Sequence, residues 1–408
     1  MGIFVMKNKT FHKKKILVVF LAAFILILYL IGRLVYLMVF DAEYYQQKAE
    51  DLHERERDIK AARGEIIDRN GKVLATNKAV CTISVIHSQI TDPDRVIQVL
   101  ADELGIEKEM IRKRVEKVSS REKIKTNVEK ETGDRIRAYE LDGVKVDEDF
   151  KRYYPYGNLA SKVLGFTGGD NQGIIGLEVF YDRYLKGKSG RIRTLTDGSG
   201  IEIDGAYEER EEPVAGGDLY ISLDVNLQNY AVQACKKVKK EKKAKQVSMI
   251  LMNPQNGEIY AMVNVPEYDL NDPFSLSAKK RKANSKKQQE YLNKKWRNSC
   301  LNDTYEPGSV SKPFTVAAGI ESGSITGNES YYCEGKLHVG EHDIACHNRY
   351  GDGYLTVTEG IERSCNVNMM YVAMATGVST FTKFQHIFNI GLKTNIDLAG
   401  ESRTASLV

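Results

Sequence analysis

The strongest pattern of hydrophobic positions along the chain is an apolar run near its start. ILVVFLAAFILILYLIG, residues 16–32, contains no charged residue, and after Arg33 the stretch LVYLMVF continues the run to Phe40. Together they supply the roughly 20 apolar residues that a helix needs to cross a bilayer core. A run that is apolar on every face does not suit the surface helix of a soluble protein. The pattern predicts a membrane-spanning helix over residues 16–40.

Lysines just before this run indicate its orientation. Lys7, Lys9, Lys13, Lys14 and Lys15 precede it, and basic residues favour the cytoplasmic side of a membrane. A cleaved signal peptide is the alternative, but its shorter apolar region would be followed by a small-residue cleavage site. We therefore expect a cytoplasmic tail over residues 1–15, an uncleaved single-pass anchor in the cell membrane, and the bulk of the chain outside the cytoplasm.

Shorter periodic segments follow the anchor. The polar stretch 41–62 is helix-prone and predicts a stalk, and Asn70-Gly71 lies between apolar runs, as in a tight hairpin. Asp92-Pro93 supplies an N-cap and a first helical residue for an amphipathic helix that ends at Gly105. A second amphipathic helix is expected over residues 107–118. These elements predict a mixed α/β module without a catalytic constellation of its own.

A boundary near residues 213–217 separates this module from a second region. We expect a helix over residues 227–240, an antiparallel hairpin of apolar strands within residues 247–265, and a loop or two short helices over residues 271–295. A chain of 408 residues suggests two or three domains. The fold class predicted is α+β multidomain, with an extracytoplasmic module over residues 41–215 and a second domain from residue 216 onward.

Composition and charge narrow the class of protein only slightly. Hydrophobic residues make up 42% and charged residues 28% of the chain, which argues against wholesale disorder. The net charge of +4 is small and predicts no nucleic-acid partner. Basic runs at residues 236–245 and 279–287 are interleaved with Glu and Gln, as on solvated helix faces. Binding of anionic wall polymers or lipid headgroups is the alternative interpretation.

The candidate chemistry lies in the stretch YEPGSVSKPF, residues 305–314. Ser-x-x-Lys occurs three times, at Ser120/Lys123, Ser277/Lys280 and Ser309/Lys312. Only the third copy follows a Pro-Gly turn and precedes an apolar helix, while the first ends a charged helix and the second lies in a basic loop. A serine hydroxyl needs a neighbouring base to become a nucleophile, and burial would lower the pKa of Lys312 toward that role. We expect Ser309 at the helix N-terminus with Lys312 one turn away.

A second polar pair follows in the helical stretch 355–377. Ser364-Cys365-Asn366 is the only Ser-x-Asn in the chain. A hydroxyl and a carboxamide two residues apart can both point into one cleft only if the backbone turns between them. There Ser364 could pass a proton and Asn366 could hold a substrate amide group.

Six cysteines are too few and too scattered for a disulfide scaffold: Cys81, Cys235, Cys300, Cys333, Cys346 and Cys365. Cys333 and Cys346 form the candidate disulfide, and free buried thiols are an equal alternative. The segment CEGKLHVGEHDIACH also offers Cys333, His338, His342 and Cys346 as zinc ligands, although their spacing matches no common structural zinc site. Cys365 could join a redox-sensitive pair with Cys333 or Cys346.

Taken together, these motifs resemble those of class B penicillin-binding proteins of the cell-division and sporulation branch. The match rests on RGEIIDRNG after the anchor, GLEVFYDRYLKGKSG, NPQNGEIYAM, Arg297-Asn298, YEPGSVSKPF and Ser-x-Asn, in the family's order. The resemblance implies a pedestal domain over residues 41–215 and a penicillin-binding transpeptidase domain over residues 216–408, with an antiparallel sheet flanked by helices.

One family motif departs from this pattern. The family's Lys-Thr/Ser-Gly triplet belongs on a sheet-edge strand after Ser-x-Asn, and it is absent there. Lys188-Ser189-Gly190 precedes the nucleophile, and Lys393-Thr394-Asn395 resembles a separate loop. We therefore expect the chain to be C-terminally incomplete within the transpeptidase domain, so that one side of the active-site cleft is not part of it.

By resemblance, the intact protein is a serine-type peptidoglycan D,D-transpeptidase that needs no metal or organic cofactor. Ser309 would attack the D-Ala-D-Ala bond of a stem peptide and would be acylated by β-lactams, with Lys312 as base, Ser364 as proton relay and Asn366 orienting the substrate. The expected partners are the stem peptides, the lipid bilayer, and glycosyltransferase and divisome or spore-cortex proteins. A non-catalytic scaffold of cell-wall synthesis or an inactive fragment is the alternative. The sequence does not decide between division and sporulation.

Overall fold

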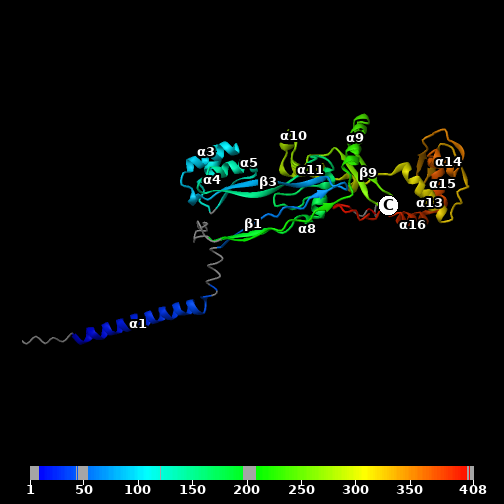
Figure 1. The fold of residues 1–408 in the computed structure, drawn as a ribbon. Helices are drawn as coiled ribbons and strands as arrows, with labels where there is room; N and C mark the ends of the chain where they lie inside the picture. Colours follow the sequence, from blue (N-terminus) through cyan, green and yellow to red (C-terminus); the bar gives the residue numbers. More distant parts are fainter. Residues whose placement is uncertain are drawn as a thin grey trace, which may run out of the picture. The chain divides into compact units, whose positions relative to one another are not determined.

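In a computed structural model, the chain is described over residues 9–42, 44, 54–119, 121–195, 208–401 and 404 (Figure 1). It divides into two compact units, each assembled from separate stretches of sequence. Unit 1 contains residues 1–64, 77–151 and 186–217, and unit 2 contains residues 65–76, 152–185 and 218–408. The continuous domain ranges expected from the sequence remain a prediction.

The apolar run forms one long helix, α1, at Lys9–Val39. Its segment Lys15–Val39 has a mean hydropathy of 2.7 over 25 residues, and none of it is buried. A helix of this length and composition can cross a hydrocarbon core, so the predicted helix is confirmed. Residues 1–8 of the predicted tail lie outside the described residues.

Unit 1 contains strands of two sheets, one of which packs against short helices. Its elements are β1 (Glu54–Ile59), most of β3 (Val73–Val85), η1 (His87–Gln89), α3 (Pro93–Leu104), α4 (Lys108–Val115), β4 (Glu122–Glu129), α5 (Lys130–Ala138), β5 (Val144–Tyr153), β6 (Gly190–Leu195) and β7 (Glu208–Glu211). β4 and β5 both pair with β3, and one hydrophobic cluster joins this sheet to α3, α4 and α5.

The ends of α3 show why the sequence predicted this helix correctly. The Asp92 side chain accepts the Arg95 backbone N–H at 3.0 Å, Pro93 occupies the first turn, and Gly105 ends the helix at a φ of 62°. Val96, Ile97 and Leu100 bury the apolar face of the helix. The second predicted helix is also confirmed as α4.

The prediction of a stalk helix over residues 41–62 is wrong for residues 54–59. Residues 54–59 form strand β1, which pairs antiparallel with β6, and residues 45–53 lie outside the described residues. Across this pair, Glu56 contacts Arg191 at 2.9 Å and Arg193 at 3.6 Å. Opposite charges on facing strands support a sheet, and the partner strand lies too far along the chain for a local pattern to reveal it.

Unit 2 contains the remaining elements. They are β2 (Ile66–Ile67), α6 (Ser161–Leu164), α7 (Gly176–Phe180), α8 (Asp182–Leu185), β8 (Leu219–Tyr220), α9 (Val225–Glu241), β9 (Val247–Met252), β10 (Ile259–Val265), α10 (Ala278–Arg281), α11 (Ser285–Trp296), α12 (Ser299–Asn302), η2 (Gly308–Ser311), α13 (Lys312–Glu321), β11 (Ser330–Cys333), β12 (Lys336–Val339), β13 (His342–Ala345), β14 (Gly353–Thr356), α14 (Val357–Glu362), α15 (Asn366–Thr376) and α16 (Val378–Ile387).

Both hairpins predicted from the sequence are present in unit 2. Gly71, at a φ of 82°, turns the chain between β2 and the start of β3. β9 and β10 pair antiparallel around Gly257, which also has a positive φ, and α9 packs on this pair. The hydrophobic cluster around β10 also contains Trp296, the only tryptophan of the chain.

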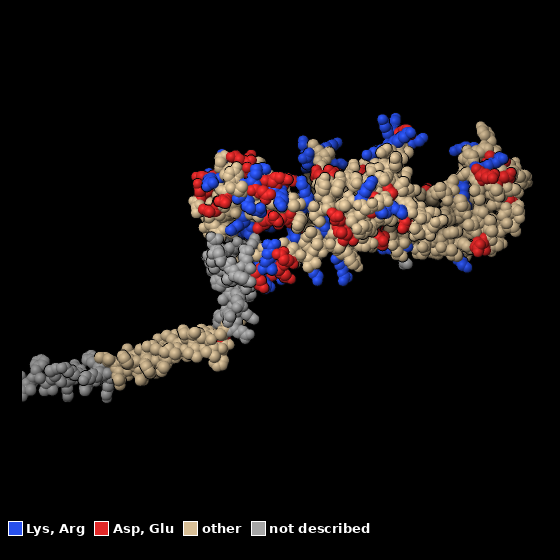
Figure 2. Space-filling model, in the orientation of Figure 1, with Lys and Arg blue, Asp and Glu red and all other residues tan. Residues whose placement is uncertain are grey.

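The basic runs lie on solvated helix faces, as predicted. Lys236, Lys237, Lys240 and Lys242 are exposed at the end of α9, and α10 buries no residue. Figure 2 shows Lys and Arg side chains standing out from the end of α9 and from α10. The stretch 271–295 forms two short helices, α10 and α11, which was one of the two structures expected.

The helices α13 to α16, the antiparallel strand pair β11–β14 and the hairpin β12–β13 form the last part of unit 2 (Figure 1). α13 packs against α15, and Val316, Ile325, Val357, Met369 and Val372 form a small core between them. α14 begins at a capping box, in which the Thr356 hydroxyl and the Glu359 carboxylate each bind the other's backbone N–H. The helical stretch expected over residues 355–377 therefore consists of two helices, α14 and α15, with a turn at Ser364 between them.

Unit 2 contains a buried ion pair. Arg152 Nε lies 2.7 Å from Glu178 Oε1, and their side chains are only 2% and 0% exposed. The Tyr154 hydroxyl also donates to Glu178. Removing one partner leaves the other charge buried. We expect Glu178→Ala to lower the free energy of unfolding by about 3–5 kcal/mol, measured by urea titration in detergent with Trp296 fluorescence as the probe.

Glu258 provides the matched control for that experiment. It pairs with Arg69 at 3.8 Å, and both side chains are well exposed. We expect Glu258→Ala to cost less than about 1 kcal/mol. A Glu178→Ala chain that unfolds at the same urea concentration as Glu258→Ala would refute a structural role for the buried pair.

Candidate active site

Ser309 lies in the short 3₁₀ turn η2, immediately before α13. Gly308 has a φ of 62° and turns the chain after Pro307. The backbone N–H of Lys312 donates to the Ser309 carbonyl, so the two residues are separated by one turn, as the spacing predicted. Ser309 therefore precedes the helix N-terminus by one turn, and its side chain is exposed to solvent.

Lys312 is the centre of the site. Its Nζ atom donates to the Ser364 carbonyl at 2.6 Å, to the Ser364 hydroxyl at 3.0 Å and to Asn366 Oδ1 at 2.7 Å. The structure thus brings three of the four residues singled out from the sequence into direct contact. Their elements, α13 and the turn before α15, are distant in sequence and meet only in the fold.

The surroundings of Lys312 shift its pKa below the ordinary value for lysine. Partial burial lowers the pKa of Lys312, and the nearby thiols of Cys346 and Cys365 act in the opposite direction. The pKa remains below the ordinary value for lysine. A lysine whose pKa is lowered holds its neutral form at a lower pH than an exposed lysine, and the neutral amine is the form that accepts a proton as a general base.

The turn between α14 and α15 explains how Ser364 and Asn366 both face Lys312. The Cys365 N–H donates to the Gly360 carbonyl at 2.8 Å and the Ser364 N–H donates to Ile361 at 2.9 Å. These two bonds form a Schellman motif, with Ser364 in the left-handed position at a φ of 54°. A serine costs more than glycine there, so its hydroxyl is retained at the expense of some backbone strain.

Lys188-Ser189-Gly190 and Lys393-Thr394-Asn395, the two triplets similar to the family's Lys-Thr/Ser-Gly motif, make local structural contacts. The Thr394 hydroxyl and backbone N–H both donate to Glu401, at 2.7 Å and 2.8 Å, which closes a local loop. Lys188 exchanges backbone hydrogen bonds with Val214 in unit 1. Within the described part of the chain, neither triplet hydrogen-bonds to Lys312, Ser364 or Asn366.

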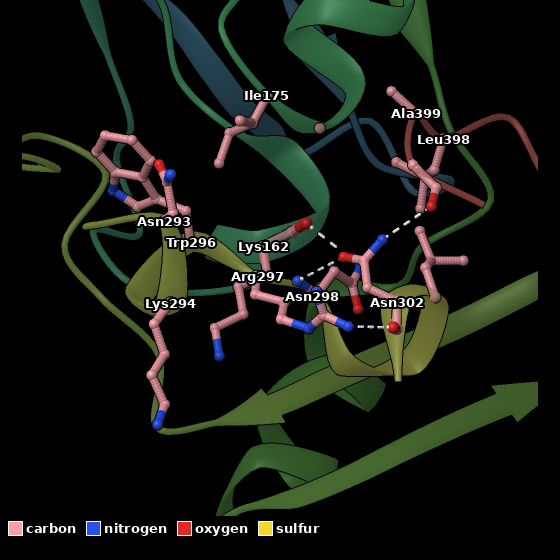
Figure 3. Close-up of a pocket in the computed structure, with 13 residues that line it drawn as sticks. Lys162, Ile175, Asn293, Lys294, Trp296, Arg297, Asn298, Asn302, Leu398 and Ala399 are labelled. Atoms are coloured by element: carbon pink, nitrogen blue, oxygen red, sulfur yellow. Dashed lines mark hydrogen bonds between the residues drawn. The ribbon is translucent and has the colours of Figure 1, made fainter. Parts of the chain in front are cut away.

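A cavity of about 580 Å³ lies elsewhere in unit 2 and contains none of the four predicted residues. Asn298 donates to the Lys162 carbonyl at 3.3 Å, and Asn302 joins the Asn298 backbone to the Gly400 carbonyl (Figure 3). Burial also lowers the pKa of Lys162. These bonds connect α6, α12 and the 398–400 segment, so we interpret the polar groups around the cavity as structural.

The cysteines agree with the alternative of free thiols and not with the candidate disulfide. All six are free thiols in the structure, so Cys333 and Cys346 are not bonded to each other. The prediction that His338 and His342 are zinc ligands is wrong. His338 Nδ1 lies 2.7 Å from Asp343 Oδ1 on the exposed β12–β13 hairpin, and His342 is the first residue of β13 on the same hairpin. Cys365 lies beside Cys346, with sulfurs 3.8 Å apart, as the proposed pairing of Cys365 required. Asp352, which the sequence analysis did not single out, joins the three cysteines in one cluster.

Comparison with known proteins gives the class of this chain. Residues 58–221 match the penicillin-binding protein dimerisation domain and residues 247–406 match the penicillin binding protein transpeptidase domain. The chain is 33% identical to stage V sporulation protein D of Bacillus subtilis over 95% of its length, and 27% identical to the peptidoglycan D,D-transpeptidase FtsI of Escherichia coli over 91%.

A solved structure agrees with these matches. Penicillin-binding protein PBP2 of Helicobacter pylori, in complex with MreC, aligns with a TM-score of 0.66 and 25% identity over 86% of this chain and 68% of that one. The chain belongs to the class B penicillin-binding proteins, in the division and sporulation branch. It spans 59% of the Bacillus relative and 61% of the Escherichia relative.

Proposed function

We propose that the protein containing this chain is a membrane-anchored peptidoglycan D,D-transpeptidase whose nucleophile is Ser309. The observation that carries this proposal is the contact of Lys312 Nζ with both the hydroxyl of Ser364 and the amide of Asn366. Acyl transfer through a serine ester needs a base close to the serine, and Lys312, whose pKa is lowered, lies one turn from the exposed Ser309.

The proposed reaction has two transfers. The Ser309 Oγ atom attacks the carbonyl of the D-Ala-D-Ala bond and gives its proton to Lys312. The peptide bond breaks, the proton passes by way of Ser364 to the amine of the departing D-alanine, and an ester on Ser309 remains. An amine of a neighbouring stem peptide then attacks this ester, and Ser309 regains its proton. Asn366 would hold the substrate amide in place during both steps.

The direct test of this function is the covalent adduct. Treatment with a penicillin should add the mass of the opened β-lactam to the tryptic peptide that contains Ser309, because β-lactams mimic the peptide terminus. Mass spectrometry of the digested protein locates the adduct. A protein that binds wall-synthesis partners but never forms the adduct would support the scaffold alternative instead.

The same proposal includes a topology for the anchor. We expect the N-terminus of α1 to lie in the cytoplasm and the chain after about residue 41 to lie outside, since lysines precede the apolar segment. In intact spheroplasts, an external protease should digest units 1 and 2 and spare an N-terminal tag. Protection of both units, with digestion only after lysis, would contradict this orientation.

Partners are proposed by analogy with relatives. The Helicobacter PBP2 relative was solved in complex with MreC, so penicillin-binding proteins with this fold can carry a protein partner. For this chain, we propose glycosyltransferase and divisome or spore-cortex proteins as partners. Crosslinking in membranes followed by affinity purification of the tagged protein would identify them.

A further inference from the structure

We propose that Cys333, Cys346, Cys365 and Asp352 bind a zinc ion beside the Ser-x-Asn turn. One ligand atom from each residue lies within 4.8 Å of all the others, and the three cysteines are buried. The Cys346 and Cys365 sulfurs are 3.8 Å apart. Tetrahedral zinc with Zn–S bonds of about 2.3 Å separates its sulfurs by about 3.8 Å, whereas bonded sulfurs are about 2.05 Å apart.

Asp352 gives an independent indication of a ligand. Its Oδ1 atom accepts a hydrogen bond from Asn348 Nδ2 at 2.8 Å. Its Oδ2 atom is buried and has no hydrogen-bond partner in the described part of the chain. Burial of an unpaired carboxylate oxygen is unfavourable, and a metal ion held by the neighbouring thiolates would satisfy it. The Asn348 contact would then fix the orientation of the ligating carboxylate.

The thiols also have the backbone partners of metal-bound thiolates. The Gly335 N–H points to Cys333 Sγ and the Asn368 N–H points to Cys365 Sγ, each at 3.4 Å. Such donors stabilise negative charge on sulfur and orient it. Three thiolates and one carboxylate form a donor set suited to a closed, four-coordinate zinc site.

The position of the cluster indicates what the ion would do. Cys365 is the middle residue of Ser-x-Asn, and Asn366 Nδ2 donates to the Ala345 carbonyl, next to Cys346, at 3.1 Å. A bound ion would therefore join the turn that carries Ser364 and Asn366 to the end of β13. Zinc here would position the turn and would not contact the substrate. The proposal goes beyond the transpeptidase function, since metal content can be measured without any acylation assay.

Elemental analysis of the purified protein tests the site. After dialysis against metal-free buffer with reductant, we expect about one zinc per chain, as in structural zinc sites. Cys333→Ser and Cys365→Ser should lose most of it, while the matched variants Cys81→Ser and Cys300→Ser should retain it. Asp352→Asn, which preserves the shape of the carboxylate, should bind zinc more weakly and guards against a cysteine variant that fails to fold.

A second measurement uses cobalt alone. Adding Co²⁺ to the metal-free protein should produce the visible absorption of tetrahedral cobalt thiolate, and Cys346→Ser should abolish it. Two results would overturn the proposal. One is equal zinc in the parent protein and in Cys365→Ser. The other is a disulfide among Cys333, Cys346 and Cys365 in protein whose thiols were alkylated at cell lysis, because bonded sulfurs cannot form this site.

Discussion

Replacement of Ser309 by alanine should abolish covalent labelling of the protein by a fluorescent penicillin. The label is an ester to the serine oxygen, so without that oxygen no covalent bond can form. Membranes that contain each variant would be incubated with the penicillin, denatured and separated on a gel. We expect a strong band from the parent protein and none from Ser309→Ala.

Ser311 is the matched control for this experiment. It lies in the same turn, and its hydroxyl donates to the Gly308 carbonyl at 2.7 Å. Ser311→Ala removes that hydrogen bond, at a cost of about 1 kcal/mol in stability, but leaves the proposed nucleophile intact. It should therefore label like the parent. If Ser309→Ala is still labelled and Ser311→Ala is not, Ser311 is the nucleophile and the assignment of Ser309 is refuted.

The elements that the sequence predicted correctly are those whose signals are local. The Asp92 cap, the Asn70-Gly71 turn and the apolar run of α1 each act within a few residues, so no knowledge of the fold is needed to find them. Strand β1 was missed because its charged residues are matched only by β6, which comes much later in the chain.

In the candidate site too, some features were indicated by local sequence and others became visible only in the fold. The residue types and spacing indicated Ser309 and Lys312, and the only Ser-x-Asn of the chain indicated Ser364 and Asn366. The Schellman turn that directs Ser364 toward Lys312 has serine where glycine is usual, so its sequence gave no helix-end signal. The Cys and Asp cluster draws its ligands from four separate segments, and only the fold brings them together.

Replacement of Lys312 by arginine should slow acylation by about 10²–10⁴-fold, the usual contribution of a general base. Arginine keeps the positive charge and can reach the same acceptors, but it does not lose its proton at ordinary pH. The comparison therefore separates proton transfer from charge. The rate of acylation by a chromogenic β-lactam would be followed by stopped flow. Lys383→Arg, at an exposed position on α16, is the control.

The pH dependence gives a second test of the same residue. Partial burial lowers the pKa of Lys312, so the neutral amine is populated at a lower pH than for an exposed lysine. The acylation rate of the parent should rise with pH through this lowered pKa and then level off, because only the neutral form accepts the serine proton. A parent rate that is independent of pH across this rise, or a Lys312→Arg rate within tenfold of the parent, would show that another group is the base. Ser364 would then be the first residue to examine, since its hydroxyl lies 3.0 Å from Lys312 Nζ.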